Sequence, residues 1–486
     1  MWSERCPFRL AAIAALLRLL VGVGSPPAQA QMETRSSLQI GGGFFALAVG
    51  DFNGDGVLDL AAVNGLPTGS IQILLGNGDG TFRSGDTYSV AVFPTAVVTA
   101  SLRNNGILDL VINDKLSDDV WVMLGNGDGT FRSAVAYHTT AESYTVAVGD
   151  LTGDGKIDVI ALEQHGTGGE SCSCVEVLPG KGDGTFGAPI TTALPHGMGG
   201  YAMTSGDFND DGKLDVAVVG ETFPVYNAVI LLGNGQGAFA VDGSYLVSSL
   251  PGSIAARNFT SSQRKLDLAV TNDTGASLSI LLGYGNGKFQ PSVYYTSYNP
   301  SSVVADDLDG DGKIDLAVAD SGPPPQREPC LSIFKGNGDG TFQTGVCYPA
   351  MAAFVVDGDF NGDGKLDIAV LGGLNSTVTV LLNTGVVSFS PTTPLNFKKQ
   401  SVGTTSGPQR VKLTNTGTTS LRIASMKASA EFGVTSTCGS SLAAGANCTI
   451  SATFSPTKKG AVQGTISIID SGSTKPMVIE VFGTGT

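Results

Sequence analysis

The stretch Asp51-Phe-Asn53-Gly-Asp55-Gly-Val57-Leu-Asp59 decides the fold, because close copies of it recur along the chain. Five copies carry an oxygen-bearing side chain at positions 1, 3, 5 and 9 and glycine at position 6, and they begin at Asp51, Asp150, Asp207, Asp307 and Asp359. This spacing suits Ca²⁺, which takes about six to eight oxygen ligands. Glycine lets position 6 turn the chain sharply around the ion. We therefore predict five calcium sites.

The predicted ligands are the side chains at positions 1, 3, 5 and 9 and the backbone carbonyl at position 7. In chain order they belong to Asp51, Asn53, Asp55, Val57, Asp59, Asp150, Thr152, Asp154, Lys156, Asp158, Asp207, Asn209, Asp211, Lys213, Asp215, Asp307, Asp309, Asp311, Lys313, Asp315, Asp359, Asn361, Asp363, Lys365 and Asp367. A set of ordinary turns without metal is the alternative, since Asp, Asn and Gly dominate turns. The repeated carboxylate spacing favours the metal, because a plain turn does not need it.

Two further copies depart from the pattern. The stretch from Ser101 to Asp109 has Arg103 at a ligand position, where a guanidinium would repel a cation. The stretch from Asn258 to Asp267 has one extra residue and lacks the central Asp and Gly. We predict that neither copy binds metal, so the fold does not need an ion in every repeat.

The seven copies begin at residues 51, 101, 150, 207, 258, 307 and 359, and this regular period indicates a repeat architecture. A second motif, Leu75-Gly-Asn-Gly-Asp-Gly-Thr-Phe82, recurs in phase and is typical of a tight hairpin. Apolar runs such as Leu266–Val270 follow the acidic loops and suit strands buried between sheets. Four strands per period and seven periods predict an all-β, seven-bladed β-propeller over residues 31–385. Residues Ser36–Ala46 are expected to complete the last blade and close the ring.

The acidic loop and the Gly-Asn-Gly-Asp-Gly-Thr-Phe turn resemble the FG-GAP/VCBS repeat of integrin α chains and of many secreted bacterial proteins. The resemblance covers residues 36 to about 385 and implies a propeller with calcium loops. It implies little about function, because the family includes adhesins, lectin-like binders and enzyme-associated domains.

Residues 386–486 follow the last repeat and read as a second all-β domain. Alternating segments such as Arg410–Asn415 and Cys448–Phe454 predict an immunoglobulin-like β-sandwich. The run from Cys438 to Gly485 resembles the Hydin-like, choice-of-anchor D type of immunoglobulin-like domain. That resemblance implies an accessory or presentation module without known chemistry.

Residues 1–30 resemble a secretory signal, with Arg5 and Arg9 before an apolar run and a small-x-small cleavage site at Ala28-Gln-Ala30. A short membrane anchor is the alternative, which the interruption of the run by Arg18 disfavours. No other segment is apolar for long enough to span a bilayer. We expect a secreted or cell-surface protein whose mature chain does not enter the membrane.

Six of the seven cysteines lie beyond that segment, and an even number in an exported protein suggests disulfides. Cys330 and Cys347 flank one Gly-rich turn symmetrically, so we expect them to face each other across two strands and form a bridge. Cys438–Cys448 is the second predicted bridge. Cys172 and Cys174 can pair only with each other or stay reduced, and a Cys-x-Cys metal site is a weaker alternative.

A formal charge of −15 disfavours nucleic acid and anionic membranes as partners. None of the three histidines lies in a recognisable nucleophile, zinc or phosphate motif, so we assign no catalytic residue. Strands alternate in direction, so the acidic loops and Gly-rich turns should share one face while the other loops converge on the opposite face. Aromatic and polar residues on that open face suit recognition, with ordinary exposed loops as the alternative. The residues are Tyr137, His138, Glu142, Tyr144, Glu163, His165, His196, Phe223, Tyr226, Tyr298 and the insertion from Pro323 to Glu328.

The sequence therefore predicts a monomeric, calcium-stabilised extracellular propeller that binds a protein or carbohydrate in recognition or adhesion. A lyase or hydrolase acting on polysaccharide from the open face is the alternative from another class. A purely structural surface protein without a discrete ligand is a third.

Overall fold

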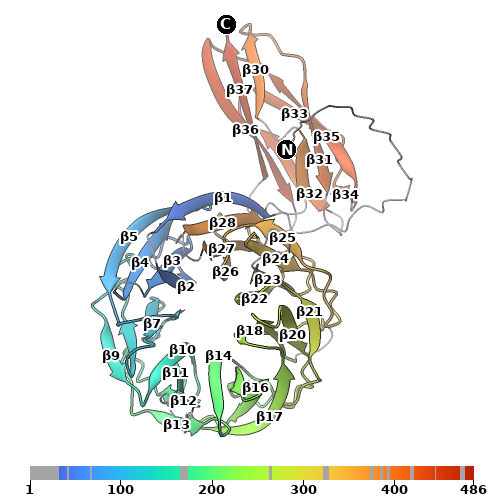
Figure 1. Cartoon of the computed structure of the whole chain (residues 1–486). Helices are drawn as coiled ribbons and strands as arrows, with labels where there is room; N and C mark the ends of the chain where they lie inside the picture. The colour runs from blue at the N-terminus through green and yellow to red at the C-terminus, as the bar shows by residue number, and fades with distance from the viewer. Residues whose placement is uncertain are drawn as a thin grey trace, which may run out of the picture.

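The structure is a computed structural model. It describes residues 32–40, 43–65, 68–164, 173–261, 265–320, 328–372, 377–383, 387–390, 394–415, 421–443, 445–470 and 477–486. The described elements are β-strands, arranged as a ring of sheets with a separate sandwich beside it (Figure 1). The predicted all-β class is confirmed.

Seven four-stranded antiparallel sheets form the blades of the ring, which confirms the predicted seven-bladed propeller (Figure 1). From the inner to the outer strand, blade 1 contains β2 (Phe44–Gly50), β3 (Asp59–Asn64), β4 (Ser70–Gly76) and β5 (Phe82–Ser89). Blade 2 contains β6 (Val97–Ala100), β7 (Asp109–Asn113), β8 (Asp119–Met123) and β9 (Val135–His138). Blade 3 contains β10 (Glu142–Gly149), β11 (Asp158–Gln164), β12 (Ser173–Leu178) and β13 (Ile190–Ala193).

The remaining blades repeat the same order. Blade 4 contains β14 (Met198–Gly206), β15 (Asp215–Thr222), β16 (Val225–Gly233) and β17 (Phe239–Val247). Blade 5 contains β18 (Pro251–Arg257), β19 (Asp267–Asn272), β20 (Ser277–Leu281) and β21 (Val293–Thr296). Blade 6 contains β22 (Ser302–Asp306), β23 (Asp315–Asp320), β24 (Cys330–Phe334) and β25 (Val346–Pro349). Blade 7 contains β26 (Phe354–Gly358), β27 (Asp367–Gly372), β28 (Thr377–Asn383) and β1 (Met32–Gln39).

The N-terminal strand closes the ring, because β1 is the outer strand of blade 7 and pairs antiparallel with β28. The bounds differ from the expected segment Ser36–Ala46: the closing strand is Met32–Gln39, and residues 44–46 begin the inner strand β2 of blade 1. The outer strand of one blade and the inner strand of the next are consecutive in the chain, so this segment divides between two blades. Pairing with β28 removes a free strand edge.

The hydrophobic core lies between neighbouring blades. Every residue of the second strands β7, β19, β23 and β27 is buried, as the continuous apolar runs predict. Alternate faces of one strand serve two interfaces: Ala61 and Val63 pack toward blade 2, whereas Leu60 and Ala62 pack toward blade 7. The buried core of the described blades is therefore divided among the interfaces between neighbouring sheets.

The C-terminal residues form a two-sheet sandwich with its own core. One sheet has the order β29 (Val387–Ser390), β31 (Gln409–Asn415), β35 (Asn447–Phe454) and β33 (Phe432–Ser436). The other has the order β30 (Leu395–Gln400), β37 (Met477–Gly485), β36 (Gly460–Asp470), β32 (Leu421–Ala428) and β34 (Ser441–Leu442). Val411, Ile450 and Phe454 are fully buried between the sheets. This confirms the predicted immunoglobulin-like sandwich.

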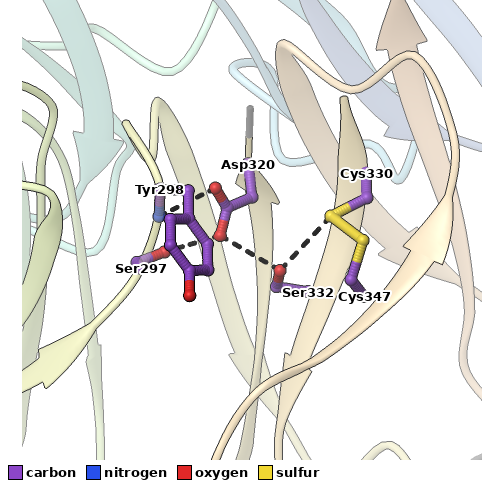
Figure 2. Close-up of a disulfide and its surroundings, with 6 residues drawn as sticks. All are labelled: Ser297, Tyr298, Asp320, Cys330, Ser332 and Cys347. Atoms are coloured by element: carbon purple, nitrogen blue, oxygen red, sulfur yellow. Dashed lines mark hydrogen bonds between the residues drawn. A yellow bond between two sulfur atoms is a disulfide. The ribbon is translucent and has the colours of Figure 1, made fainter. Parts of the chain in front are cut away.

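Both predicted disulfides are present. Cys438 and Cys448 are bridged with their Cα atoms 4.8 Å apart, and Cys330 and Cys347 with their Cα atoms 5.6 Å apart (Figure 2). The expected direct pairing of Cys330 with Cys347 is wrong, because Cys330 lies opposite Pro349 and Cys347 lies opposite Ser332. The bridge therefore runs diagonally across β24 and β25, a separation that two cysteine side chains can still span.

Candidate functional site: the acidic loops and the open face

The closing aspartate of each acidic loop is a structural anchor. Asp59 is fully buried; its Oδ2 accepts a hydrogen bond from the Phe52 N–H (3.0 Å) and its Oδ1 accepts one from the Gly76 N–H (2.8 Å). Gly76 ends the third strand of the blade, so one carboxylate joins the loop to the strand beside the Gly-rich turn. Asp215 makes the equivalent bonds to Phe208 (2.9 Å) and Gly233 (2.8 Å).

The same anchor persists in the two departed copies. Asp109 accepts from the N–H groups of Leu102 (3.1 Å) and Gly125 (2.9 Å). Asp267 accepts from those of Phe259 (2.8 Å) and Gly283 (2.7 Å). The carboxylate at position 9 therefore accepts backbone hydrogen bonds that hold the loop to the blade, and this role does not require an ion. This role was not predicted from the sequence, although both copies that depart from the pattern keep Asp at position 9, which was the available signal.

Positions 1 and 5 shape the loop itself. Asp51 accepts hydrogen bonds from the N–H groups of Gly54 (2.7 Å) and Gly56 (2.9 Å), and Asp55 accepts from the Val57 N–H (2.8 Å). Gly56 has a positive φ of 80°, a conformation that favours glycine. The side-chain oxygens are therefore held around a tight turn before any ion binds.

Position 7 carries lysine in four of the five intact loops, and its ammonium lies beside the carboxylate at position 5. The Nζ–Oδ2 distances are 2.6 Å for Lys156 and Asp154, 3.4 Å for Lys213 and Asp211, 2.8 Å for Lys313 and Asp311, and 3.6 Å for Lys365 and Asp363. These pairs range from exposed to half-buried and reach solvent, where an ion pair contributes little free energy, so a divalent ion can displace them. Only the backbone carbonyl of position 7 was expected to take part in the site. The structure places the lysine side chain beside the predicted ligands as well.

In blade 2 an internal cation occupies the acidic loop. The Arg103 guanidinium lies 2.5 Å from Asp109 Oδ1 and 2.6 Å from the Gly125 carbonyl oxygen. Its side chain is 14% exposed, so the ion pair is largely shielded from water. This geometry explains how the loop keeps its shape with an arginine at a ligand position.

The blade 6 loop gives the most compact donor set for a divalent cation. Carboxylate oxygens of Asp307, Asp309 and Asp315 lie within 4.8 Å of one another. Asp315 Oδ2 is buried without a hydrogen-bond partner, and burial raises the pKa of this carboxyl to about 7. The ammonium of Lys335, the residue after the end of β24, contacts Asp309. Buried, mutually close carboxylates fit a hard cation, which would supply the missing partner.

The acidic loops also join each blade to the next. The Gly129 N–H of blade 2 donates to the Phe52 carbonyl of blade 1 (2.9 Å), and the Gly287 N–H of blade 5 donates to the Phe208 carbonyl of blade 4 (2.9 Å). Aromatic rings reinforce the junction, since Phe289 packs edge-on against both Phe208 (5.8 Å between centroids) and Tyr245 (5.6 Å). The loops and turns therefore form the inter-blade joints on one face.

The inner strands line a cavity of about 700 Å³ at the opposite, open face of the ring. Each blade contributes the residue six positions before its acidic loop; these are Phe45, Thr95, Tyr144, Tyr201, Gly252, Ser301 and Ala353. We call this cavity the channel mouth. At this position blades 1, 3 and 4 carry aromatic rings and blades 5, 6 and 7 carry small residues, and Phe354 of blade 7 adds a further ring to the lining. The fixed offset from the acidic loop was the sequence signal that could have identified these residues.

Polar groups in the channel mouth have defined positions. The Lys115 Nζ lies 4.5 Å from the centroid of the Tyr144 ring. The Tyr201 hydroxyl donates to Glu221 Oε2 (3.0 Å), and burial together with that carboxylate raises the pKa of Tyr201 to about 12. Tyr201 is therefore a neutral phenol near neutral pH.

The predicted open-face residues do not form one cluster. Tyr144 lines the channel mouth, and Glu142 is exposed beside it at the start of β10. His138 is exposed and lies 3.3 Å from Asp119, while His196 is exposed in the turn after β13. Phe223 is 85% exposed at the β15–β16 turn, and Tyr226 packs on the blade 4 and 5 core. Tyr298 donates its N–H to Asp320 (2.9 Å), as Figure 2 shows.

Tyr137 lies elsewhere than expected. Its ring packs edge-on against Phe186 of blade 3 (5.0 Å), and its hydroxyl lies 3.3 Å from the Gly184 carbonyl oxygen in the Gly-rich turn. Tyr137 lies between blades, as Tyr245 does, because each tyrosine ring on an outer strand packs against a phenylalanine of the next blade. His165, Cys172 and residues 1–30 lie outside the described residues, as does most of the insertion from Pro323 to Glu328.

Two buried glutamates lie side by side in blade 3. Glu163 and Glu176 are both fully buried, and the Thr140 hydroxyl lies 3.0 Å from Glu163 Oε2 and 3.2 Å from Glu176 Oε1. Cys174 Sγ lies 3.8 Å from Glu163 Oε2. Burial, and next the neighbouring Glu176 carboxylate, raise the pKa of Glu163 to about 7. Glu163 was expected on the open face and instead lies inside the blade.

Comparison with known families agrees with both parts of the fold. The FG-GAP-like repeat matches residues 51–112, 102–161, 153–218 and 264–318. The ASH (ASPM-SPD-2-Hydin) domain matches residues 384–478. No curated protein matches the chain.

Several solved structures resemble the chain at low identity. A lectin of Agrocybe aegerita, described as recognising non-reducing terminal N-acetylglucosamine, is 16% identical, with 72% of this chain and 86% of that chain covered and a TM-score of 0.43. The V. cholerae biofilm matrix protein Bap1 is 12% identical, with 74% and 92% covered and a TM-score of 0.39. A PapD-like domain of human CEP192 is 16% identical, with 21% and 85% covered and a TM-score of 0.17.

Proposed function

We propose that this protein, a propeller of FG-GAP-like repeats followed by an ASH domain, is a calcium-stabilised module for extracellular recognition or adhesion. Its ligand, a protein or a carbohydrate, binds at the channel mouth. The observation that supports this proposal is the cavity itself, which is lined by aromatic rings of blades 1, 3, 4 and 7 and leaves open space beside Gly252 and Ser301. A concave site with aromatic walls and few polar groups is the usual form of a ligand site.

An extracellular setting is supported by the two disulfides, because such bonds persist mainly in oxidising compartments. The part of the chain that the structure describes contains no helix with the length and apolar character needed to span a membrane. Secretion through residues 1–30 is part of the proposal, and N-terminal sequencing of the exported protein would test it.

Calcium is assigned to the five intact acidic loops. The buried, unpartnered oxygen of Asp315 and the close approach of Asp307 and Asp309 support the assignment in blade 6. Bound ions would neutralise carboxylates at the inter-blade joints and so stabilise the ring. With free Ca²⁺ at about ten times Kd, each independent site would add about 1.4 kcal/mol to the free energy of unfolding.

Calorimetry of the full chain in calcium and in chelator tests this assignment. We expect a clearly higher melting temperature in calcium, with magnesium at equal ionic strength as the control. An unchanged melting temperature would exclude calcium stabilisation.

Binding at the channel mouth is tested by obstructing it. Gly252 is exposed at the cavity, and an added Cβ would have only ordinary contacts, so Gly252→Trp should fold and fill the space with an indole. The wild-type protein, this variant and Gly407→Trp, an exposed change in the sandwich, are compared on a glycan array and against extracellular matrix proteins. Loss of binding in Gly252→Trp alone is expected. Equal binding by all three proteins would place recognition elsewhere.

The alternative, a polysaccharide lyase or hydrolase, predicts product release from the same glycans. The close carboxylate pair Glu163 and Glu176 is a poor candidate for such chemistry, because both side chains are fully buried. Chromatography of the glycans after incubation separates the two functions, since a binding module leaves their length unchanged.

A further inference from the structure

We propose that the channel mouth recognises a carboxylated saccharide, such as a uronic acid unit, through an aromatic platform and the ammonium group of Lys115. This inference rests on the proposed recognition function and adds the class of ligand. It starts from the charge of the cavity. The whole chain has a formal charge of −15, yet the charged side chain among the described lining residues is a cation, Lys115.

Lys115 is held in place by a well-bonded turn. Its N–H donates to the Phe93 carbonyl (3.0 Å). The buried Asp114 carboxylate before it accepts hydrogen bonds from the N–H groups of Val92 (2.6 Å), Phe93 (2.9 Å) and Leu116 (3.1 Å). The base of the lysine side chain is therefore fixed at the rim, which lowers the entropic cost of using it in binding.

The ammonium group is available for an anion. It lies over the Tyr144 ring at 4.5 Å from the centroid, and it forms no ion pair with a carboxylate in the described part of the chain. The neighbouring Asp114 is already committed to backbone donors. A half-buried ammonium whose contact is a π face keeps strong donor capacity, so a ligand carboxylate can complete its coordination.

The walls of the mouth determine the shape of the ligand. The rings of Phe45, Tyr144 and Tyr201 come from the same position in three repeats, and Gly252 and Ser301 stand at that position in other blades. Phe354 of blade 7 also lines the cavity, and the small residues Gly252 and Ser301 leave space beside the rings for a flat, ring-shaped ligand. The apolar C–H face of a sugar ring can pack on such a platform, because aromatic side chains supply large apolar area without a charge.

The Lys115 ammonium and the aromatic rings together favour one class of ligand. A neutral saccharide would use the platform but leave the ammonium of Lys115 without an anionic partner. A simple anion would pair with Lys115 but leave the rings unused. A sugar ring bearing a carboxylate uses both groups at once.

The test compares oligogalacturonate with the same oligosaccharide after methyl esterification, which removes the charge and keeps the ring. Binding is measured by titration calorimetry with the full chain in calcium. The variants are Lys115→Met, which keeps the apolar stem, and Lys181→Met, an exposed lysine on the Gly-rich turn of the other face, as the control of equal charge. We expect at least a tenfold weaker affinity for oligogalacturonate in Lys115→Met, little change in Lys181→Met, and weak binding of the ester by all proteins.

Equal affinity of the acid and the ester, or an equal affinity in wild type and Lys115→Met, would overturn the inference. A different outcome is that the protein binds some other ligand and that Gly252→Trp abolishes this binding. That outcome would support the proposed function and reject a uronic acid as the ligand. Binding of oligogalacturonate that Gly252→Trp does not weaken would instead remove the channel mouth as the site. The three results are therefore distinguishable.

Discussion

At the scale of single residues, the buried pair in blade 3 sets a pH dependence. The pKa of Glu163 lies near 7 in the folded protein, above the ordinary value of 4.5. The folded state therefore binds this proton more tightly than the unfolded state does, so its contribution to stability is present below pH 4.5 and is lost as the pH rises through 7. A shift of this size corresponds to about 3 kcal/mol at most.

Glu163→Gln should remove that loss, because the amide keeps an acceptor for the Thr140 hydroxyl and cannot ionise beside Glu176. At pH 8 we expect the variant to be more stable than the wild type by about 1–3 kcal/mol, and at pH 5 to be equal or slightly less stable. Urea denaturation in saturating calcium at both pH values measures the difference. Glu142→Gln, an exposed change in the same blade, is the control. A variant with the pH dependence of the wild type would show that Glu163 is not the responsible group.

At the scale of elements, the acidic loop combines two separable functions. Its closing aspartate anchors the loop to the third strand in every blade type, whereas the other acidic positions carry the proposed ion. Blade 5 isolates the first function, because Asp267 keeps both backbone bonds in a loop predicted not to bind metal.

Asp267→Asn should therefore destabilise the protein by the same amount with and without calcium. The amide retains one acceptor oxygen and turns a donor toward a backbone N–H, which costs about 1–3 kcal/mol when buried. Asp51→Asn, at the half-buried first position of the blade 1 loop, should mainly reduce the gain in stability from calcium. Chemical denaturation in calcium and in chelator measures both effects. A calcium-dependent loss in Asp267→Asn would contradict the assignment of blade 5 as metal-free.

At the scale of elements, some features could be predicted from the sequence and others could not. Period, strand number and the shared face of loops and turns follow from local patterns, so all three could be predicted. Register could not: the turn closes at Gly336–Phe342, one position from the pair about which the two cysteines are symmetric, and one more residue enters before the ladder of β24 and β25, so Cys330 lies opposite Pro349. The position of Tyr137 depends on how neighbouring blades meet, which no single repeat encodes, whereas the channel-mouth residues could have been found from their fixed offset to the acidic loops.

At the scale of the whole molecule, the ring is a row of equivalent joints with different local charges. Four intact loops carry a lysine at position 7, blade 6 adds Lys335, and blade 2 inserts Arg103 into the loop itself. The positive charge beside the acidic loop therefore differs from blade to blade, and blade 1 has Val57 where the other intact loops have lysine. The number of bound ions should therefore be a property of a few side chains and not of the propeller fold.

Blade 2 offers a direct test, because its loop already has the backbone of an intact one. Ser101 Oγ accepts from the Gly106 N–H (3.0 Å) as Asp51 Oδ2 accepts from the Gly56 N–H (2.9 Å). Asn105 Oδ1 accepts from the Ile107 N–H (3.0 Å) as Asp55 Oδ1 does from the Val57 N–H (2.8 Å). The changes Ser101→Asp, Arg103→Asn and Asn105→Asp would remove the internal cation and restore the oxygen ligands at positions 1, 3 and 5.

We expect the triple variant to bind one calcium ion more than the wild type, which equilibrium dialysis with elemental analysis would count. In chelator the triple variant should be less stable than the wild type, because the Asp109 carboxylate loses the Arg103 guanidinium that neutralises it. Arg103→Asn alone is the control, since it removes the guanidinium without supplying the carboxylates of an intact loop. An unchanged ion count in a folded triple variant would mean that the side chains alone do not decide occupancy. The spacing between neighbouring blades would then have to differ at each joint.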